Sequence, residues 1–443
     1  MEEHKRAQLL HKDRQYVWHP FTQMKDYENQ DHLLIEKAEG IHLYGADGRT
    51  YMDTVSSWWV NVHGHGHPRI KQAIQEQMER MDHVMFSGLT HEPAIVLAEK
   101  LVERTPEGLT RVFYSDNGST AVEVALKMSY QYWQHQGHKT KHKFIYLQGS
   151  YHGDTLGAVS VGGVDLYHAI FKPLLFSAYQ APSPAISGME QSLEAIEDLM
   201  KRHQSEIAGI VIEPLIQAAG GMHIYGADFL TRLRALCNTY EIHLIADEVA
   251  TGFGRTGKMF ACEYAGMTPD LICLSKGLTA GVMPLSATLC TEEIYQSFYD
   301  DYETLKTFFH GHSFTGNPLA CAVGIESLNI FEDDNLLGHV QEVSAYMQQQ
   351  FRRFADLEHV DHIRGLGMVA ALNLVKDKDR QEAYDPVKRA GYQIYKQGLE
   401  EGLILRPLGD TIYYWLPLCT TKEQVDTIIA RTSSVIEKVT AKL

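Results

Sequence analysis

Residues 243–277 read HLIADEVATGFGRTGKMFACEYAGMTPDLICLSKG, and this stretch decides the fold. It opens on the largely apolar run His243–Ala246 and closes on a second apolar run, Leu271–Leu274. Neither run alternates polar with apolar residues, which is typical of strands buried on both faces of a parallel sheet. The run Ile207–Ile212 has the same character. The middle of the chain therefore predicts an α/β architecture.

The pattern outside this stretch predicts three parts: an N-terminal segment (1–55), a large domain (56–325) and a smaller α+β domain (326–443). The first segment does not fit the parallel sheet, so we expect it to pack with the small domain. Further strands are expected at Arg111–Ser115, Phe144–Leu147, Gly367–Leu374 and Thr411–Leu416. Helices are expected from the turn after Ser115 to Trp133, and at Ala320–Phe331, Val340–Phe354 and Lys422–Val439.

Composition narrows the classes of partner and the compartment. The formal net charge of the 443 residues is -16, which disfavours nucleic-acid binding because phosphate backbones are also negative. No run approaches the roughly 18 apolar residues of a membrane span. The six cysteines show no C-x-x-C spacing, and the N-terminus lacks the apolar region of a secretory signal. We expect a cytoplasmic protein with small-molecule partners.

Lys276 ends the apolar strand at 271–274 and is followed by a glycine. Burial disfavours a charged ammonium, so a lysine in this setting loses its proton more easily. The free amine can attack an aldehyde and form a Schiff base. Taken alone, a lysine at a strand end is more often an ordinary surface residue.

Asp247 strengthens the interpretation of Lys276, because it stands at the carboxyl end of another buried strand. Ligands bind outside these ends in α/β sheets. A carboxylate there suits the pyridine nitrogen of pyridoxal 5'-phosphate (PLP), since it keeps the nitrogen protonated and the ring electron-poor. The alternative is a helix cap or a surface acid.

Two loops after predicted strands complete the candidate site. Asn117, Gly118 and Ser119 lie where a strand turns into a helix, and amides at a helix N-terminus bind phosphate. Simple capping by Ser119 or Asp116 is the alternative. Tyr151 follows the strand at 144–147, where an aromatic ring can stack on a flat cofactor; a structural tyrosine is the alternative.

Two histidine-glycine clusters, at 63–67 and 310–312, lack the cysteine or carboxylate spacing of a zinc site. We therefore predict no metal. The loop GFGRTG (252–257) does not match a dinucleotide fingerprint, and we interpret it as a structural loop near the site.

Together, DEV (247–249), GFGRTG (252–257) and SKG (275–277) resemble the class III (ω-amino acid) aminotransferases, which are fold-type I PLP enzymes. The resemblance covers about residues 18–419. It implies a large domain with a mainly parallel seven-stranded sheet, and PLP as cofactor. It also implies a homodimer in which each active site is built from residues of both subunits. Further segments resemble the branch of this family that aminates 8-amino-7-oxononanoate in biotin synthesis. They are WHPFTQM (18–24), SSWW (56–59), MFSGLTHEPA (85–94), YHGDT (151–155), GNPLAC (316–321) and RPLG (406–409).

The resemblance also implies roles for single residues. Lys276 carries PLP and moves the proton, Asp247 pairs with the ring nitrogen, and Tyr151 stacks near the ring. Arg406 binds the carboxylate of the oxononanoate. The residues implied in phosphate binding are Asn117, Gly118 and Ser119, with His312 and Ser313 of the neighbouring subunit. The residues implied in substrate binding are Phe21, Trp58, Tyr151, Lys276, Gly311, Arg406 and Tyr413.

Two departures leave the amino donor open. Phe21 stands where relatives that use S-adenosylmethionine carry tyrosine, and His312-Ser313 replaces proline-threonine. Both changes are similar to the branch that takes its amino group from L-lysine. The residues similar to the adenosylmethionine branch are Trp58, Met85-Phe86, His91 and Tyr413. We favour S-adenosylmethionine. The alternatives are L-lysine as donor, another class III ω-aminotransferase or aminomutase, and a PLP-fold regulator without activity, which the presence of both Lys276 and Asp247 disfavours.

Overall fold

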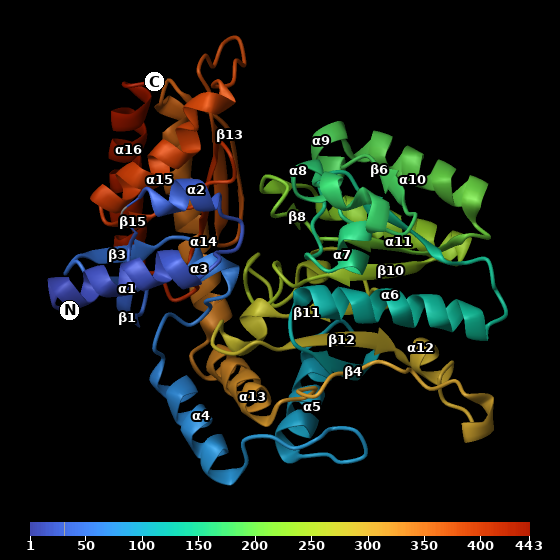
Figure 1. Ribbon diagram of the computed structural model, residues 1–443. Helices are drawn as coiled ribbons and strands as arrows, with labels where there is room; N and C mark the ends of the chain where they lie inside the picture. The colour runs from blue at the N-terminus through green and yellow to red at the C-terminus, as the bar shows by residue number, and fades with distance from the viewer. Residues whose placement is uncertain (31) are drawn as a thin grey trace.

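The computed structural model describes residues 1–30 and 32–443. Its centre is one seven-stranded sheet (Figure 1). The strands in spatial order are β4 (Leu109–Ser115), β12 (Ser286–Thr291), β11 (Leu271–Leu274), β10 (His243–Asp247), β7 (Ile207–Ile212), β5 (Lys143–Leu147) and β6 (Tyr179–Ala181). β12 runs antiparallel to both neighbours, and the other neighbouring pairs are parallel. The predicted α/β fold with a mainly parallel sheet is confirmed.

Helices cover both faces of this sheet. Alternate side chains of a strand point to opposite faces, so neighbouring residues pack against different helices. Ile245 and Cys273 share an apolar cluster with α6 (Gly118–His135). Leu244 and Ile272 belong to the other cluster, with α10 (Met189–His203) and α11 (Ala227–Tyr240). Each residue of β7 and of β10 is buried. These are the strands whose lack of alternation predicted burial on both faces.

Two strands of the central sheet were not predicted from the sequence. β6 has only three residues. β12 reads SATLCT, with hydroxyl side chains at alternate positions, yet Ser286 and Thr288 are buried. The Thr288 hydroxyl donates to the carbonyl of Ala121 in α6, 2.9 Å away, so a hydrogen bond offsets the cost of burying it.

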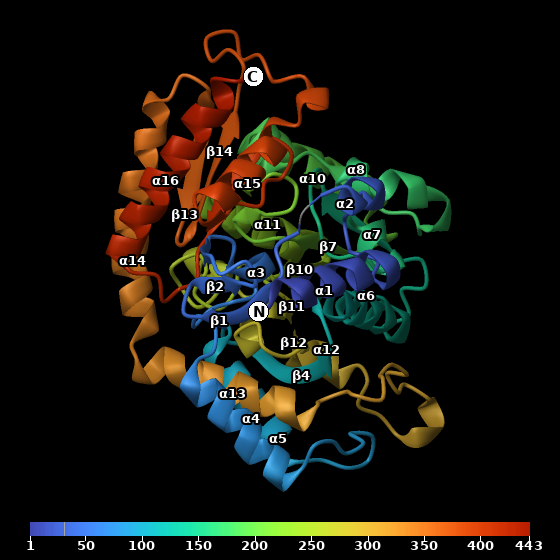
Figure 2. The same ribbon diagram turned by 60° about the vertical axis from the view of Figure 1, so that its left-hand side comes forward.

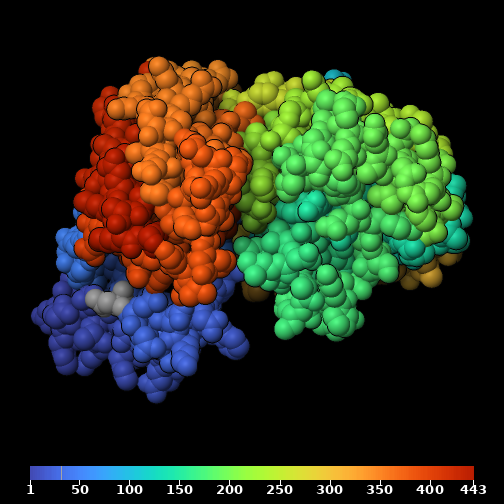
Figure 3. All heavy atoms as spheres, turned by 90° about the horizontal axis from the view of Figure 1, so that it is seen from above, coloured from blue at the N-terminus to red at the C-terminus, as the bar shows by residue number. Residues whose placement is uncertain are grey.

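The C-terminal part contains an antiparallel sheet of β13 (Val360–Leu366), β14 (Val369–Leu374) and β16 (Thr411–Trp415). Its main helices are α14 (Leu336–Phe351), α15 (Ala390–Glu400) and α16 (Lys422–Thr440). In Figures 2 and 3 the N-terminal segment (blue) lies against this part (orange to red).

A second sheet joins the two ends of the chain. It contains β1 (Ile35–Glu39), β2 (His42–Gly45), β3 (Thr50–Asp53) and β15 (Leu403–Ile404). β15 pairs in parallel with β3, which sets Asp53 opposite Ile404. The division of the chain at residues 55 and 325 stays a prediction, and its second boundary falls inside the helix α13 (Pro318–Asp333).

The remaining elements connect these layers. They are α1 (Glu3–Tyr16), α2 (Met24–Glu28), α3 (Ser56–Trp59), α4 (Pro68–Arg80), α5 (Glu92–Arg104), α7 (Leu156–Ser160), α8 (Asp165–His168), α9 (Pro184–Ser187), α12 (Glu292–Gln296), β8 (Ile216–Gln217) and β9 (His223–Ile224). Six short 3-10 helices lie at Ala169–Leu174, Ala261–Tyr264, Lys276–Thr279, Tyr302–Thr304, Arg352–Asp356 and Pro386–Lys388. None of the helices in the described residues is both long and apolar enough to cross a membrane.

Candidate active site

A cavity of about 980 Å³ lies at the carboxyl ends of the central strands. Parallel strands bring residues far apart in sequence to the same edge of a sheet, which explains why four separate predicted segments meet here. The cavity is lined by residues of the turn 116–119, the loop 151–155, the strand ends 247–250 and 275–276, and also by residues 57–60 and 406–409.

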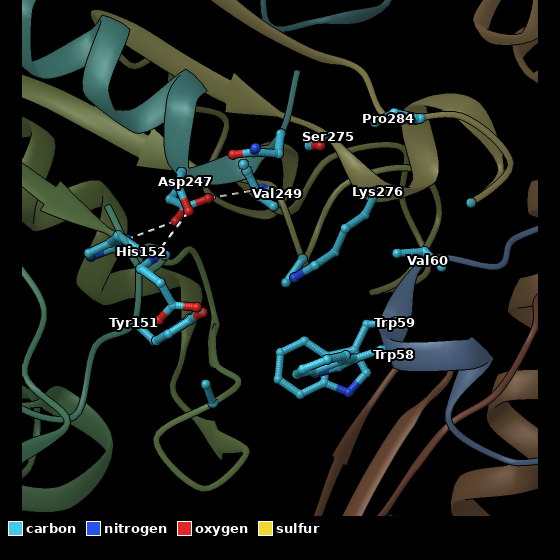
Figure 4. Close-up of a pocket in the computed structure, with 18 of the residues that line it drawn as sticks. Trp58, Trp59, Val60, Tyr151, His152, Asp247, Val249, Ser275, Lys276 and Pro284 are labelled. Carbon is cyan, nitrogen blue, oxygen red and sulfur yellow. Dashed lines mark hydrogen bonds and ion pairs between the residues drawn. The ribbon is translucent and has the colours of Figure 1, made fainter. Parts of the chain in front are cut away.

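Lys276 follows β11 and points into this cavity (Figure 4). Burial lowers the pKa of its amine to about 8, although the nearby carboxylates of Asp247 and Glu213 act in the opposite direction. The Nζ atom lies 4.8 Å from the centre of the Trp59 ring. In the described part of the chain it has no hydrogen bond or ion pair with a protein group. The amine is thus available for covalent chemistry near neutral pH.

Asp247 ends β10 and is 5% exposed. One carboxylate oxygen accepts a hydrogen bond from the backbone N–H of Val249 at 3.0 Å. The other lies 2.7 Å from Nδ1 of His152 (Figure 4). These contacts fix the carboxylate inside the cavity, where an anion can pair with a cationic ring nitrogen.

His152 and Glu213 are site residues that the sequence did not single out. The buried Nε2 atom of His152 has no hydrogen-bond partner in the described structure. Glu213 accepts hydrogen bonds from the backbone N–H groups of Tyr151 and Ala218, each at 3.0 Å. Burial raises the pKa of Glu213 to about 7. The indications available in the sequence were that His152 follows Tyr151 directly and that Glu213 follows the buried run 207–212.

The predicted phosphate turn lies at the N-terminus of α6, on the cavity wall. The side chain of Asn117 caps the helix by accepting from the N–H of Thr120 at 3.1 Å, so the cap is neither Ser119 nor Asp116. A Cβ atom added to Gly118 would approach Val249 to 2.6 Å, so only glycine fits there. The partial positive charge of an 18-residue helix is directed at this wall, which suits a phosphate.

Aromatic rings form the opposite wall. The Phe21 ring lies 5.7 Å from Trp58 and 5.4 Å from Tyr167, edge-on to both. The guanidinium carbon of Arg406 lies 4.3 Å from the centre of the Trp58 ring. Among the described residues, no acidic side chain pairs with Arg406. The Tyr413 hydroxyl is hydrogen-bonded to the Arg406 guanidinium, and the guanidinium can still bind an anionic group.

Four predicted residues do not line the cavity. Tyr413 is 1% exposed and lies behind Trp59, whose indole N–H donates to the Tyr413 hydroxyl at 3.1 Å. Gly311, His312 and Ser313 lie in an outer segment. Nε2 of His312 is 3.3 Å from a carboxylate oxygen of Asp116. Their predicted roles stay predictions.

Two of the three histidines of the 63–67 cluster have separate protein partners. His63 lies 2.9 Å from the Ser327 hydroxyl, and His65 lies 3.0 Å from a carboxylate oxygen of Asp53. Within residues 1–30 and 32–443, no three His, Cys, Asp or Glu side chains are grouped so as to hold a metal ion.

Comparison with known proteins agrees with this geometry. The model of the class-III aminotransferase family matches residues 24–436. The chain belongs to this family. Class III aminotransferases are PLP-dependent transaminases, and so is this one. The prediction of a PLP-dependent enzyme is confirmed.

Several relatives of this class III aminotransferase are similar over nearly their whole length. The adenosylmethionine-8-amino-7-oxononanoate aminotransferase of Geobacter sulfurreducens is 47% identical over 97% of each chain. The enzyme of the same name from Anoxybacillus flavithermus is 46% identical over 98% of this chain and 97% of its own. The crystal structure of that enzyme from Methanocaldococcus jannaschii has a TM-score of 0.95 at 40% identity, covering 98% and 99% of the two chains. An omega transaminase of Pseudomonas jessenii has a TM-score of 0.93 at 30% identity, covering 98% of each.

The residues of the cavity fit PLP. An amine without a protein partner (Lys276) and a fixed carboxylate (Asp247) lie in one cavity with a helix N-terminus. The unpaired Nε2 of His152 supplies a further polar atom beside Asp247. When bound, PLP supplies the electron sink that stabilises negative charge at the substrate carbon.

Proposed function

We propose that this aminotransferase transfers an amino group from S-adenosylmethionine to 8-amino-7-oxononanoate, giving 7,8-diaminononanoate in biotin synthesis. The observation that carries the proposal is one cavity with the amine of Lys276 and, on its aromatic wall, the guanidinium of Arg406, which has no acidic partner among the described residues. The oxononanoate has a carbonyl to be aminated and a carboxylate at the far end of an apolar chain. The names of relatives that are 47% and 46% identical support the same assignment.

Each side chain of the cavity has a task in this reaction. We assign covalent attachment of the cofactor to Lys276, which also carries the proton to and from the substrate carbon. When PLP is bound, Asp247 would keep the ring nitrogen protonated and Tyr151 would lie against the ring. The Asn117 side chain and the backbone N–H groups of Gly118 and Ser119 would hold the phosphate, since the Asn117 N–H already donates to the Thr120 hydroxyl at 3.1 Å.

Substrate binding falls to the aromatic wall and to Arg406. The rings of Phe21, Trp58 and Tyr167 exclude water from the alkyl chain of the oxononanoate, and they suit the flat adenine of the donor. The Arg406 fork binds the substrate carboxylate. Phe21 contributes its ring without a hydroxyl, which is why L-lysine is the competing donor.

The donor half-reaction tests this proposal. S-adenosylmethionine added to the purified PLP-loaded enzyme should remove the visible absorption of the bound cofactor as the amino group is taken up, and L-lysine should not. Addition of 8-amino-7-oxononanoate should then restore the band. A response to L-lysine alone would assign the enzyme to the lysine-using branch, and no return of the band would point to another class III activity. Lys276→Ala serves as the control that should respond to neither donor.

We also propose a homodimer in which Gly311, His312 and Ser313 reach the site of the neighbouring subunit. An exposed apolar surface supports it, because large patches of this kind mark protein interfaces. The exposed side chains of this surface include Met85 (58% exposed), Leu89 (50%), Phe309 (75%) and Phe314 (59%). The two segments that carry them adjoin, since His83 lies 2.8 Å from the carbonyl oxygen of Ser313.

Sedimentation and subunit mixing test the dimer. The enzyme should sediment at twice the 50.1 kDa of one chain. Equal amounts of Lys276→Ala and His312→Ala subunits should form about half heterodimers, each with one intact site of two, so mixing should restore about a quarter of the wild-type activity. An active enzyme that sediments as a single chain would rule the shared site out.

We propose the cytoplasm as the compartment and small molecules as the partners. The six cysteines are all free, and five of them are buried, which suits a reducing environment.

A further inference from the structure

Residues 56–59 form one turn of left-handed backbone without a glycine. The φ angles of Ser56, Ser57, Trp58 and Trp59 are 50°, 45°, 70° and 73°. L-residues visit this region one at a time, and a run of four is unfavourable because each Cβ crowds a carbonyl oxygen. Such a turn persists only where its surroundings hold it, and strain of this kind concentrates at functional sites.

One buried carboxylate holds the turn. Asp53 is 0% exposed and ends β3. Its Oδ1 accepts from the backbone N–H groups of Val55 (3.2 Å) and Ser57 (3.0 Å). Its Oδ2 accepts from the Ser57 hydroxyl at 2.7 Å and lies 3.0 Å from Nε2 of His65. The hydrogen-bond partners of this carboxylate lie in residues 55–57 and on His65, and the carboxylate also interacts electrostatically with the buried guanidinium of Arg255.

His65 and Asp53 are themselves fixed by the backbone. His65 exchanges two backbone hydrogen bonds with Gly40, at 2.9 and 2.7 Å. Asp53 lies opposite Ile404 in the β3–β15 pair, two residues before Arg406. The backbone of Asp53 is therefore fixed beside the strand that leads to Arg406, while its carboxylate bonds to the left-handed turn.

The turn places two adjacent tryptophans on the cavity wall (Figure 4). Trp59 lies under the amine of Lys276 and stacks on Trp415 at 5.1 Å. Trp58 lies under the guanidinium of Arg406. In a right-handed turn, the two indole rings would leave in other directions. The left-handed turn thus determines where the two rings lie relative to the Lys276 amine and the Arg406 guanidinium.

We propose that Asp53, supported by His65, is a positioning residue for the binding of 8-amino-7-oxononanoate, because it holds the 56–59 turn, and with it the rings of Trp58 and Trp59, in its left-handed form. The proposal rests on the proposed function. Asp53 touches neither substrate nor cofactor, and it acts through Trp58 and Trp59.

Asp53→Asn in the PLP-loaded enzyme tests the proposal, because the amide keeps one acceptor and replaces the other by an N–H donor. We expect the KM for 8-amino-7-oxononanoate to rise roughly tenfold while kcat changes less than about threefold. The near-ultraviolet circular dichroism from the Trp59–Trp415 stack should weaken. Adding Ser57→Gly to this variant should bring the KM and the dichroism much of the way back to the wild-type values, since glycine adopts φ near 45° without crowding.

Asp47→Asn is the matched control. Asp47 also accepts from a backbone N–H, that of Arg49 at 3.0 Å, and from a tyrosine hydroxyl, that of Tyr51 at 2.6 Å, but it lies outside the cavity. Its substitution should leave the KM and the dichroism unchanged.

Three outcomes would overturn the proposal: an unchanged KM and dichroism in Asp53→Asn, a loss that Ser57→Gly does not reverse, or an equal change in the control. If Asp53→Asn does not fold, His65→Gln removes one of the four contacts and should raise the KM by a smaller factor; an unchanged KM there would overturn it equally. If the wild-type enzyme turns over no oxononanoate, the proposed function fails. The dichroism and its reversal by glycine still report on the turn.

Discussion

Lys276→Ala should lose all measurable turnover, with kcat/KM falling by more than about 10⁴-fold, and the visible absorption of the enzyme-bound cofactor should disappear. The substitution removes the amine that attaches the cofactor and also the group that carries the proton, and proton transfer by a positioned group alone is worth roughly 10²- to 10⁴-fold. A steady-state transamination assay and an absorption spectrum of the purified variant measure both effects.

Lys141→Met is a matched control for this substitution. Lys141 is 4% exposed, and burial lowers the pKa of its amine to about 8, as at Lys276. It lies outside the cavity, over the ring of Trp133. The control should keep its absorption band and most of its turnover. Retained turnover in Lys276→Ala, or an equal loss in both variants, would refute the assignment of the catalytic lysine.

Arg406→Ala should raise the KM for 8-amino-7-oxononanoate by roughly 30- to 150-fold, while the KM for the amino donor changes little. Hydrogen bonds to a charged group contribute about 2–3 kcal/mol, and each 1.4 kcal/mol is tenfold in binding. The KM of Arg406→Lys for the oxononanoate should lie between those of the wild type and Arg406→Ala, because lysine keeps the charge and loses the planar fork. Full kinetics with each substrate varied in turn would separate the two KM values.

Arg389→Ala controls for the loss of an arginine from the same part of the chain. Arg389 also lies over an aromatic ring, that of Tyr392 at 4.3 Å, and pairs with Asp26 at 2.6 Å outside the cavity. It should leave both KM values unaltered. An equal rise of the donor and oxononanoate KM in Arg406→Ala would mean that Arg406 does not select the carboxylate.

The sequence predicted the parts of the fold that depend on burial. β7, β10 and β11 are buried along their whole length, so their residues carry an unbroken apolar pattern. Lys276 and Asp247 were found because a charged residue at the end of such a strand departs from that pattern. β12 carries buried hydroxyl groups that bond to other elements, and the sequence of the strand alone does not indicate these partners. The strand was therefore not predicted.

The parts of the site that were missed depend on long-range contacts. The role of Glu213 comes from two backbone N–H groups in separate loops. The left-handed turn at 56–59 contains no glycine, so nothing in the letters SSWW indicates its conformation. The hydrogen bond from the Trp59 indole to the Tyr413 hydroxyl likewise depends on how β16 packs. Local patterns do not encode these relations.

The pairing of β3 with β15 has a consequence for the making of the enzyme. The hydroxyl of Thr54 bonds to the carbonyl of Ile404 at 2.7 Å, across 350 residues of chain. During translation, the first strands of this sheet leave the ribosome long before their partner exists, and contacts of such sequence separation form late. The aromatic wall and Arg406 therefore come together only when almost the whole polypeptide has been synthesised. A truncated chain would contain Lys276 but could not select a substrate.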